Sequence, residues 1–322
     1  MGRSRKGNLV VRRFVDMWAL AGMHPTNIDL LQRLRSADDR QFGANMDVCG
    51  DISQQDPDTG KWEENHVIGI RSDMWDPEEE KLQKALNSLK DERREQLRRE
   101  IKRSGRLDKK QSYKLGRQLN RDPLMQMKPS DLVHRRLVMK MFRSTSERIR
   151  WAGTIEEVTT HEVHNSIGCG RPALSLAVLL PGYEYVITIQ QNHRFPRIPA
   201  TFTFSFLDED DKRIRYVAIK RKWVSAGADF DILSGGRKIG LIDGRLFGFG
   251  YNAQIRIDDP AFSDNRPFLD LITLFTATVG YHRQMRKSVN RRVRAALAGA
   301  SFQHVVEDEE FWLLKNPRRR AA

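Results

Sequence analysis

The pattern of apolar and polar residues changes character about halfway along the chain. Up to about residue 145, apolar residues recur at helical spacings, whereas after residue 150 they alternate with a period of two between Gly-rich turns. A period of two places every second side chain on one face of a strand. The pattern therefore predicts a mainly helical region over 1–145 and a β-rich region that begins at 146.

The clearest helix is predicted over 76–104. Pro77 suits the first helical position, and Gly105 can end the helix in a left-handed conformation. Further helices are predicted over 108–119 and 129–143. The first helix carries a narrow apolar stripe on a charged background, formed by Leu82, Leu86, Leu89, Leu97 and Ile101. Such a stripe suits either a coiled-coil partner or packing against the helix's own domain.

Short strands are predicted through the second half of the chain. They cover 154–163, 173–180, 183–191, 201–207, 214–222, 228–233, 237–242 and 252–257. Pro181–Gly182, Ser234–Gly236 and Asp243–Gly244 are predicted hairpin turns, because Gly adopts positive φ without steric cost. In the first half, Asp56–Gly60 is a predicted turn between two extended pieces. Many short strands joined by tight turns indicate a β-sandwich or a β-barrel.

A repeat with an offset of 23 residues supports this interpretation. Lys222–Ile232 and Arg245–Ile255 both run from a cation through two apolar residues and a Gly to a short strand that ends in Ile. A repeated pattern of this kind indicates one supersecondary unit, here strand–turn–strand, used twice.

The segment 268–281 is apolar on nearly every side. At about 14 residues it is shorter than the roughly 20 that a membrane span needs, so we expect it to be buried inside the protein. The predicted fold class is therefore α+β, with a C-terminal antiparallel β-barrel around a central hydrophobic helix at 268–281. The predicted domains are a mainly helical, basic region over 1–145, the barrel over 146–285, and a basic tail over 286–322.

A family resemblance rests on the stretch from Tyr216–Ser225 through Ile257 and on the apolar segment that follows. This stretch resembles the tubby C-terminal-like superfamily, and within it the LURP-one-related and phospholipid-scramblase branch, with the best match over about 200–281. The resemblance implies a twelve-stranded antiparallel barrel wrapped around a hydrophobic C-terminal helix. It also implies that cations at the barrel rim bind the phosphates of phosphoinositides.

The charge of the chain favours an anionic partner. The formal net charge is +14, and Lys and Arg outnumber Asp and Glu both before and after residue 150. A basic surface of this kind suits nucleic acid, anionic lipid or acidic proteins without choosing among them. Two distant cysteines, Cys49 and Cys169, indicate a reducing compartment. We find neither a secretory signal nor a transmembrane pattern, so we expect a cytoplasmic protein that associates peripherally with membranes.

The sequence offers little catalytic chemistry. His161, His164 and Cys169 form the one metal-like cluster, but in a strand the two histidines would point to opposite faces, and no fourth ligand is evident. The glycines of 244–250 join strands and do not open a helix, so they do not form a phosphate loop. We expect neither a metal nor a cofactor, and we expect no enzymatic activity.

The candidate binding residues are cations around the repeat. Alternation places Lys220 and Lys222 on the exposed face of their strand. The candidate ligand-binding residues for an anionic ligand are Lys220, Lys222, Arg237, Lys238 and Arg245. Further cations lie in His282–Arg294 and in Arg318–Arg320.

Three functions follow from these features. The first is a non-enzymatic peripheral protein that binds anionic lipid headgroups or another phosphorylated ligand. The second is a nucleic-acid-associated protein that uses the basic helices and tails. The third is a scaffold that binds a protein partner through the helix at 76–104.

Overall fold

The computed structural model describes most of the chain. The described residues are 10–18, 32–34, 41–42, 46–76, 79–103, 109–128, 135–145, 148–193, 200–208, 211–223, 227–247 and 250–297. They form two compact units, one made of 1–75 with 136–322 and the other of 76–135. The cations predicted at Arg318–Arg320 lie outside the described residues.

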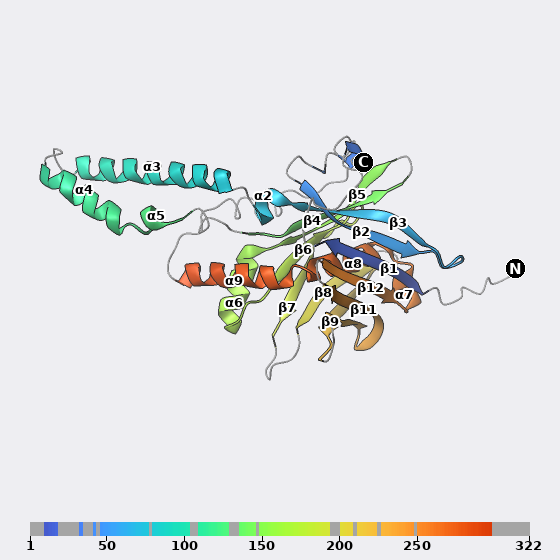
Figure 1. The fold of residues 1–322 in the computed structure, drawn as a ribbon. Helices are drawn as coiled ribbons and strands as arrows, with labels where there is room; N and C mark the ends of the chain where they lie inside the picture. Colours follow the sequence, from blue (N-terminus) through green and yellow to red (C-terminus); the bar gives the residue numbers. More distant parts are fainter. Residues whose placement is uncertain are drawn as a thin grey trace. The chain divides into compact units, whose positions relative to one another are not determined.

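The first unit is a closed antiparallel barrel (Figure 1). Its strands are β1 (Val11–Trp18), β2 (Met46–Gln55), β3 (Trp62–Arg71), β4 (Val138–Ser144), β5 (Ile149–Glu157), β6 (Ser175–Leu179), β7 (Ile187–Asn192), β8 (Thr201–Asp208), β9 (Arg213–Arg221), β10 (Phe230–Ser234), β11 (Arg237–Phe247) and β12 (Gly250–Ile257). Each strand pairs with its neighbours in sequence, and β1 pairs with β12 from Val11↔Ile257 to Trp18↔Gly250. This last pairing removes the free edges of the sheet.

Alternating side chains explain why most of these segments form strands. In β8, Phe202, Phe204 and Phe206 are buried, whereas the Thr and Ser residues between them are more exposed. Burying one such ring contributes about 1.5–3 kcal/mol, so a shift of one residue in register would expose a row of aromatic rings. The same alternation holds in β12, where Tyr251 and Ile255 are among the buried residues.

Helix α8 (Arg266–Val279) packs against the barrel strands. Asn265 caps its first turn by accepting a hydrogen bond from the amide of Phe268 at 3.0 Å. Its side chains from 268 to 278 are buried, and the helix contacts β1, β4, β5 and β12. A Cβ atom added at Gly153 of β5 would lie 2.8 Å from Leu274, so this close approach of helix and strand requires glycine.

The predicted fold class is wrong. The molecule is a closed twelve-stranded antiparallel barrel with several helices, and not a C-terminal barrel around a central helix behind a mainly helical N-terminal region. Residues before 145 supply the four strands β1 to β4. The predicted boundary near 145–150 falls between two paired strands, β4 and β5.

The missed strands lack a simple alternation for physical reasons. In β1, the inward-facing position 13 is a buried arginine. In β3 and β4, both faces are covered, because Val67 and Phe142 join a second apolar cluster that contains Leu34 and Phe42. Strands buried on both faces give near-continuous apolar runs that resemble helix.

Three local predictions also need correction. The predicted helix over 129–143 overlaps β4, and its first residues lie outside the described ones. The predicted strand over 154–163 is two elements, because β5 ends at Glu157 and helix α6 (Thr159–Cys169) follows. Asp243–Gly244 is not a turn but part of β11, where the amide of Gly244 donates to the Asp229 carboxylate at 3.0 Å.

Buried ion pairs join α6 and helix α9 (His282–Leu297) to the barrel. The guanidinium of Arg292 bonds Glu162 of α6 and lies 3.5 Å from Glu157 of β5. Arg136 donates to the Glu157 carbonyl at 2.8 Å and to the Glu156 carboxylate at 3.0 Å. All five side chains are at most 7% exposed. We call these residues the α6/α9 network.

Shorter helices complete the barrel unit. Helix α2 (Ser72–Trp75) follows β3, and helix α7 (Pro260–Ser263) lies between β12 and α8. The ring of Trp75 meets Tyr281 edge-on at 5.3 Å between centroids.

The second unit is helical, as predicted for this stretch. It contains α3 (Glu79–Arg103), α4 (Lys109–Arg121) and α5 (Pro123–Gln126), which confirms the helices predicted over 76–104 and 108–119. Arg93 of α3 bonds Asp122 at 2.8 Å. On α3, Leu86, Leu97 and Ile101 of the apolar stripe are buried.

None of the helices in the described ranges combines the length and the apolar character that crossing a membrane requires.

Candidate functional site

The structure does not bring the five predicted cations together. Arg237 and Lys238 begin β11, whereas Arg245 lies near its other end. With a rise of about 3.3 Å per residue, Arg237 and Arg245 are roughly 26 Å apart along the strand. Lys220 lies near the end of β9, and Lys222 follows that strand.

Two of the five cations are neutralised by carboxylates. Arg237 lies 2.5 Å from Asp259, and Lys238 lies 2.6 Å from Asp231. A cation that already has a close carboxylate partner gains less from a second anion. These two residues are therefore weaker candidates for ligand binding than the sequence indicated.

Lys220 and Lys222 are exposed. In the register of the sheet, Lys220 stands opposite Thr201 of β8 and Asp231 of β10. Neither ammonium group has an ion pair with a described residue. Trp223, next in the chain, is 74% exposed.

Helix α9 adds cations that the site prediction omitted. Met285, Val289 and Arg292 face the barrel unit and are buried. The exposed residues of α9 include five cations, Arg283, Arg286, Lys287, Arg291 and Arg294. The helix contains no Asp or Glu, so nothing on α9 itself offsets these charges. The sequence showed the basic run, but only the fold shows which of its residues face solvent.

His282 links the two groups of cations. Its pKa is lowered to about 4, first by burial and then by the positive charges of Arg286 on α9 and Arg221 at the end of β9. The ring of His282 also lies 5.9 Å from the ring of Phe202 on β8, and Phe202 stands opposite Ile219 of β9, so the end of β9 lies near the start of α9. We define the α9/β9 surface as Lys220, Arg221, Lys222, Arg283, Arg286 and Lys287, all of which are exposed.

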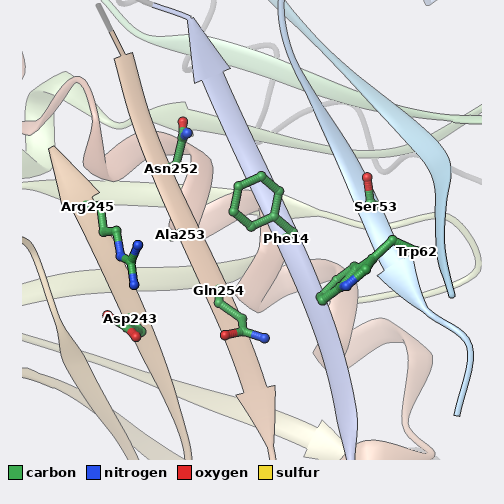
Figure 2. A pocket seen from close by; sticks show the side chains of 8 residues that line it. All are labelled: Phe14, Ser53, Trp62, Asp243, Arg245, Asn252, Ala253 and Gln254. Carbon is green, nitrogen blue, oxygen red and sulfur yellow. The ribbon is translucent and has the colours of Figure 1, made fainter. Parts of the chain in front are cut away.

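Arg245 lies elsewhere, in an open groove across β11, β12, β1, β2 and β3 (Figure 2). The groove has a volume of about 460 Å³. Phe14 and Trp62 form one side, with an edge-on contact at 6.3 Å between ring centroids. Arg245 and Asp243 are the charged residues of the lining, and Figure 2 shows them side by side. Their opposite charges leave the groove without the positive excess that a phosphate site needs.

The predicted metal-like cluster does not become a site. His161, His164 and Cys169 lie on α6 and are exposed. Among the described residues, no three His, Cys, Asp or Glu side chains come together in a way that could hold a metal ion.

Comparisons with protein-family models, with curated proteins and with solved structures each found no match. The tubby-like resemblance of the sequence therefore stays a prediction.

Proposed function

We propose that this protein is a non-enzymatic binding protein that recognises anionic lipid headgroups, or another phosphorylated ligand, through the α9/β9 surface. One observation carries the proposal. Six exposed cations lie at or just after the end of β9 and in the first turns of α9, and none has an ion pair with a described residue.

The physical basis is the attraction of basic residues to an anionic membrane surface. Each Lys or Arg close to such a surface contributes about 1 kcal/mol, which salt reduces. Exposed Trp223 would assist, because indole rings favour the boundary between water and lipid. Together these groups favour reversible, charge-dependent docking.

Vesicle co-sedimentation tests this proposal. The full chain should bind vesicles that contain phosphatidylserine or phosphatidylinositol bisphosphate, and it should bind phosphatidylcholine vesicles far less. Replacing Lys220, Lys222 and Arg286 by Ala should weaken anionic-vesicle binding at least tenfold, on the order of 1 kcal/mol per cation.

The matched control replaces Arg237 and Lys238 by Ala, since both are exposed cations with carboxylate partners. This control should bind within about threefold of the parent protein, because less free charge is removed. Equal binding to neutral and anionic vesicles, or unchanged binding by the triple variant, would refute the proposal.

Nucleic acid is the second candidate ligand, and α9 is the observation that favours it. Its five exposed cations could contact successive phosphates of a nucleic-acid backbone. Gel-shift titrations of duplex and single-stranded DNA at several salt concentrations would discriminate. Binding near physiological salt that is tighter than binding to anionic vesicles would favour this function.

The scaffold function has less support, because Leu86, Leu97 and Ile101 of the α3 stripe are already buried. Light scattering of the full chain with and without Leu86→Glu would show whether α3 mediates self-association.

A further inference from the structure

Three arginines gather around the first turn of α8. Arg266 is the first residue of this helix, Arg13 comes from β1, and Arg143 comes from β4. Arg13 lies 2.8 Å from one oxygen of Asp270, and Arg266 lies 3.7 Å from the other. A single carboxylate therefore faces two guanidinium groups. We call Arg13, Arg143 and Arg266 the α8 arginine group.

Arg13 is fixed in place by further hydrogen bonds. Its Nη1 donates to the Thr273 hydroxyl at 2.9 Å, and its Nε donates to the Gln54 side chain at 3.1 Å. The side chain is 3% exposed. Arg13 therefore serves as a rigid, buried positive charge that positions Asp270 and is itself shielded from solvent.

Arg143 has no acidic partner in direct contact among the described residues. Its Nε lies 3.3 Å from Nε2 of His66. His66 Nδ1 lies 2.5 Å from the Asn65 side-chain oxygen, so Nδ1 is the donor and Nε2 accepts from Arg143. His66 is accordingly neutral. Its pKa is lowered to about 2, first by burial and then by Arg13, Arg143 and Arg266.

The charges around Arg143 do not balance. Burial and the nearby Arg266 and Arg13 lower its pKa, and Asp270 opposes them. Asp270 contacts Arg13 and Arg266 and acts on Arg143 only at longer range, so the three guanidinium groups outnumber this carboxylate. A partly buried excess of positive charge is unfavourable unless an anion or water compensates it.

The excess charge can be reached from solvent. Arg143 is half-buried, and the side chain of Arg266 is 58% exposed. The positive end of the α8 helix dipole begins at Arg266, which adds to the attraction for an anion. Arginine forks match the oxygens of phosphate, with two parallel hydrogen bonds for each fork.

We propose that the α8 arginine group binds a phosphate group, with Arg143 and Arg266 as direct ligands and Arg13 as a positioning residue. The ligand is free phosphate or a phosphate monoester on a larger molecule. This site is separate from the α9/β9 surface, because His282 follows the end of α8 and Arg266 begins it. The helix between them is about 20 Å long, given 14 residues at about 1.5 Å each.

Thermal unfolding of the full chain with sodium phosphate is the first test. Chloride and acetate at matched ionic strength serve as reference anions. At about ten times its Kd, phosphate should raise Tm by about 3 °C above the reference anions. In a nuclear magnetic resonance titration, the His66 ring signals should shift with the same Kd, because His66 contacts Arg143.

Single substitutions locate the site. Arg143→Gln and Arg266→Gln should each weaken phosphate binding about tenfold, as expected for loss of a charged hydrogen-bonding partner. Arg256→Gln is the matched control, since Arg256 is a partly exposed arginine paired with Asp258 at 3.0 Å. Because Arg266 is mostly exposed, Arg266→Gln should fold even if Arg143→Gln does not.

A second arm separates free phosphate from a phosphorylated headgroup. Soluble inositol bisphosphate replaces inorganic phosphate in the same measurements. Binding of either ligand that is lost in Arg266→Gln supports the site, and the tighter ligand identifies the source of the phosphate. A Tm no higher than in matched chloride with both ligands, or equal binding by Arg266→Gln, would overturn the proposal. Replacing Lys220 and Lys222 should leave phosphate affinity unchanged, so this test and the vesicle test can fail independently.

Discussion

The barrel unit holds two groups of arginines, and the groups differ in their counter-charges. In the α6/α9 network, Arg136 and Arg292 meet three glutamates, and both guanidinium groups donate to carboxylates. In the α8 arginine group, Asp270 contacts Arg13 and Arg266, and Arg143 has no carboxylate in direct contact among the described residues. In the α6/α9 network the glutamates balance the arginines, whereas in the α8 arginine group the arginines outnumber the carboxylate.

The same contrast appears on the outer surface of the barrel. Arg237 and Lys238 have carboxylates within 2.6 Å, whereas Lys220 and Lys222 have none among the described residues. The number of cations in a stretch of sequence is therefore a poor guide to binding. What matters is which cations the fold leaves without a partner.

The largest expected effect is a loss of stability when the α6/α9 network loses an arginine. Arg292→Met should lower the free energy of unfolding by about 3–5 kcal/mol, because it leaves Glu157 and Glu162 buried without their shared cation. Urea unfolding measures this loss. Arg291→Met, which changes the adjacent exposed arginine of α9, is the control and should stay within about 0.5 kcal/mol of the parent.

This loss should depend on pH. Burial and the neighbouring Glu157 raise the pKa of Glu162 above its ordinary value, and Arg292 opposes that rise. A raised folded-state pKa means that stability falls as pH rises from the ordinary glutamate pKa through the folded one. Without Arg292 the pKa of Glu162 rises further, so the loss should be greater at pH 8 than at pH 5. An equal loss at both values would contradict this account.

A smaller effect is expected in the α8 arginine group. Arg143→Met should change the free energy of unfolding by less than about 1 kcal/mol in phosphate-free buffer. The substitution removes repulsion from Arg13 and Arg266, and this gain offsets the lost hydrogen bond to His66. Urea unfolding in chloride buffer measures the change. A loss of about 3 kcal/mol or more would mean that Arg143 is structural, and the contrast between the two regions would fail.

The smallest expected effect concerns a partly buried carboxylate, that of Asp51, in place of an arginine. On β2, burial raises the pKa of Asp51 to about 6, and the carboxylates of Asp16 and Glu64 add to the rise. The charged form is therefore disfavoured in the folded protein, and stability is lost as pH rises through 6. Asp51→Asn should stabilise the protein at pH 8 by less than about 1 kcal/mol, because the side chain is partly solvated, and it should give no gain at pH 4. Urea unfolding at both pH values tests this, with exposed Asp58→Asn as the control.

Strands with a clear alternation, such as β8, could be predicted from the sequence, whereas β4, which is covered on both faces, could not. The alternation of Phe202, Phe204 and Phe206 with polar residues predicts strand β8. By contrast, Phe142 of β4 faces a second apolar cluster, so its strand lacks polar positions at the right spacing. A period-two pattern records which positions meet solvent, and it disappears when neither face does.

Of the candidate sites, the sequence could predict only which side chains are exposed, and only where apolar and polar residues alternate along a strand. The exposure of Lys220 and Lys222 follows from the pattern of β9, whose inward positions include Val217 and Ile219. The pairing of Arg237 with Asp259 and the contact of Arg143 with His66 depend on side chains 22 and 77 residues apart. Such pairings depend on how the fold brings distant segments together, which the sequence pattern alone does not supply.

The pairing of β1 with β12 has a consequence for how the protein is made. Val11 finds its partner Ile257 only after nearly the whole barrel has been synthesised. At about 5–20 residues per second, a ribosome needs roughly 10–50 s to produce the intervening chain. During that interval, β1 carries one edge without its final partner, and such an edge can pair with other chains. A chaperone that covers nascent β-strands would therefore be most valuable to this protein before β12 emerges.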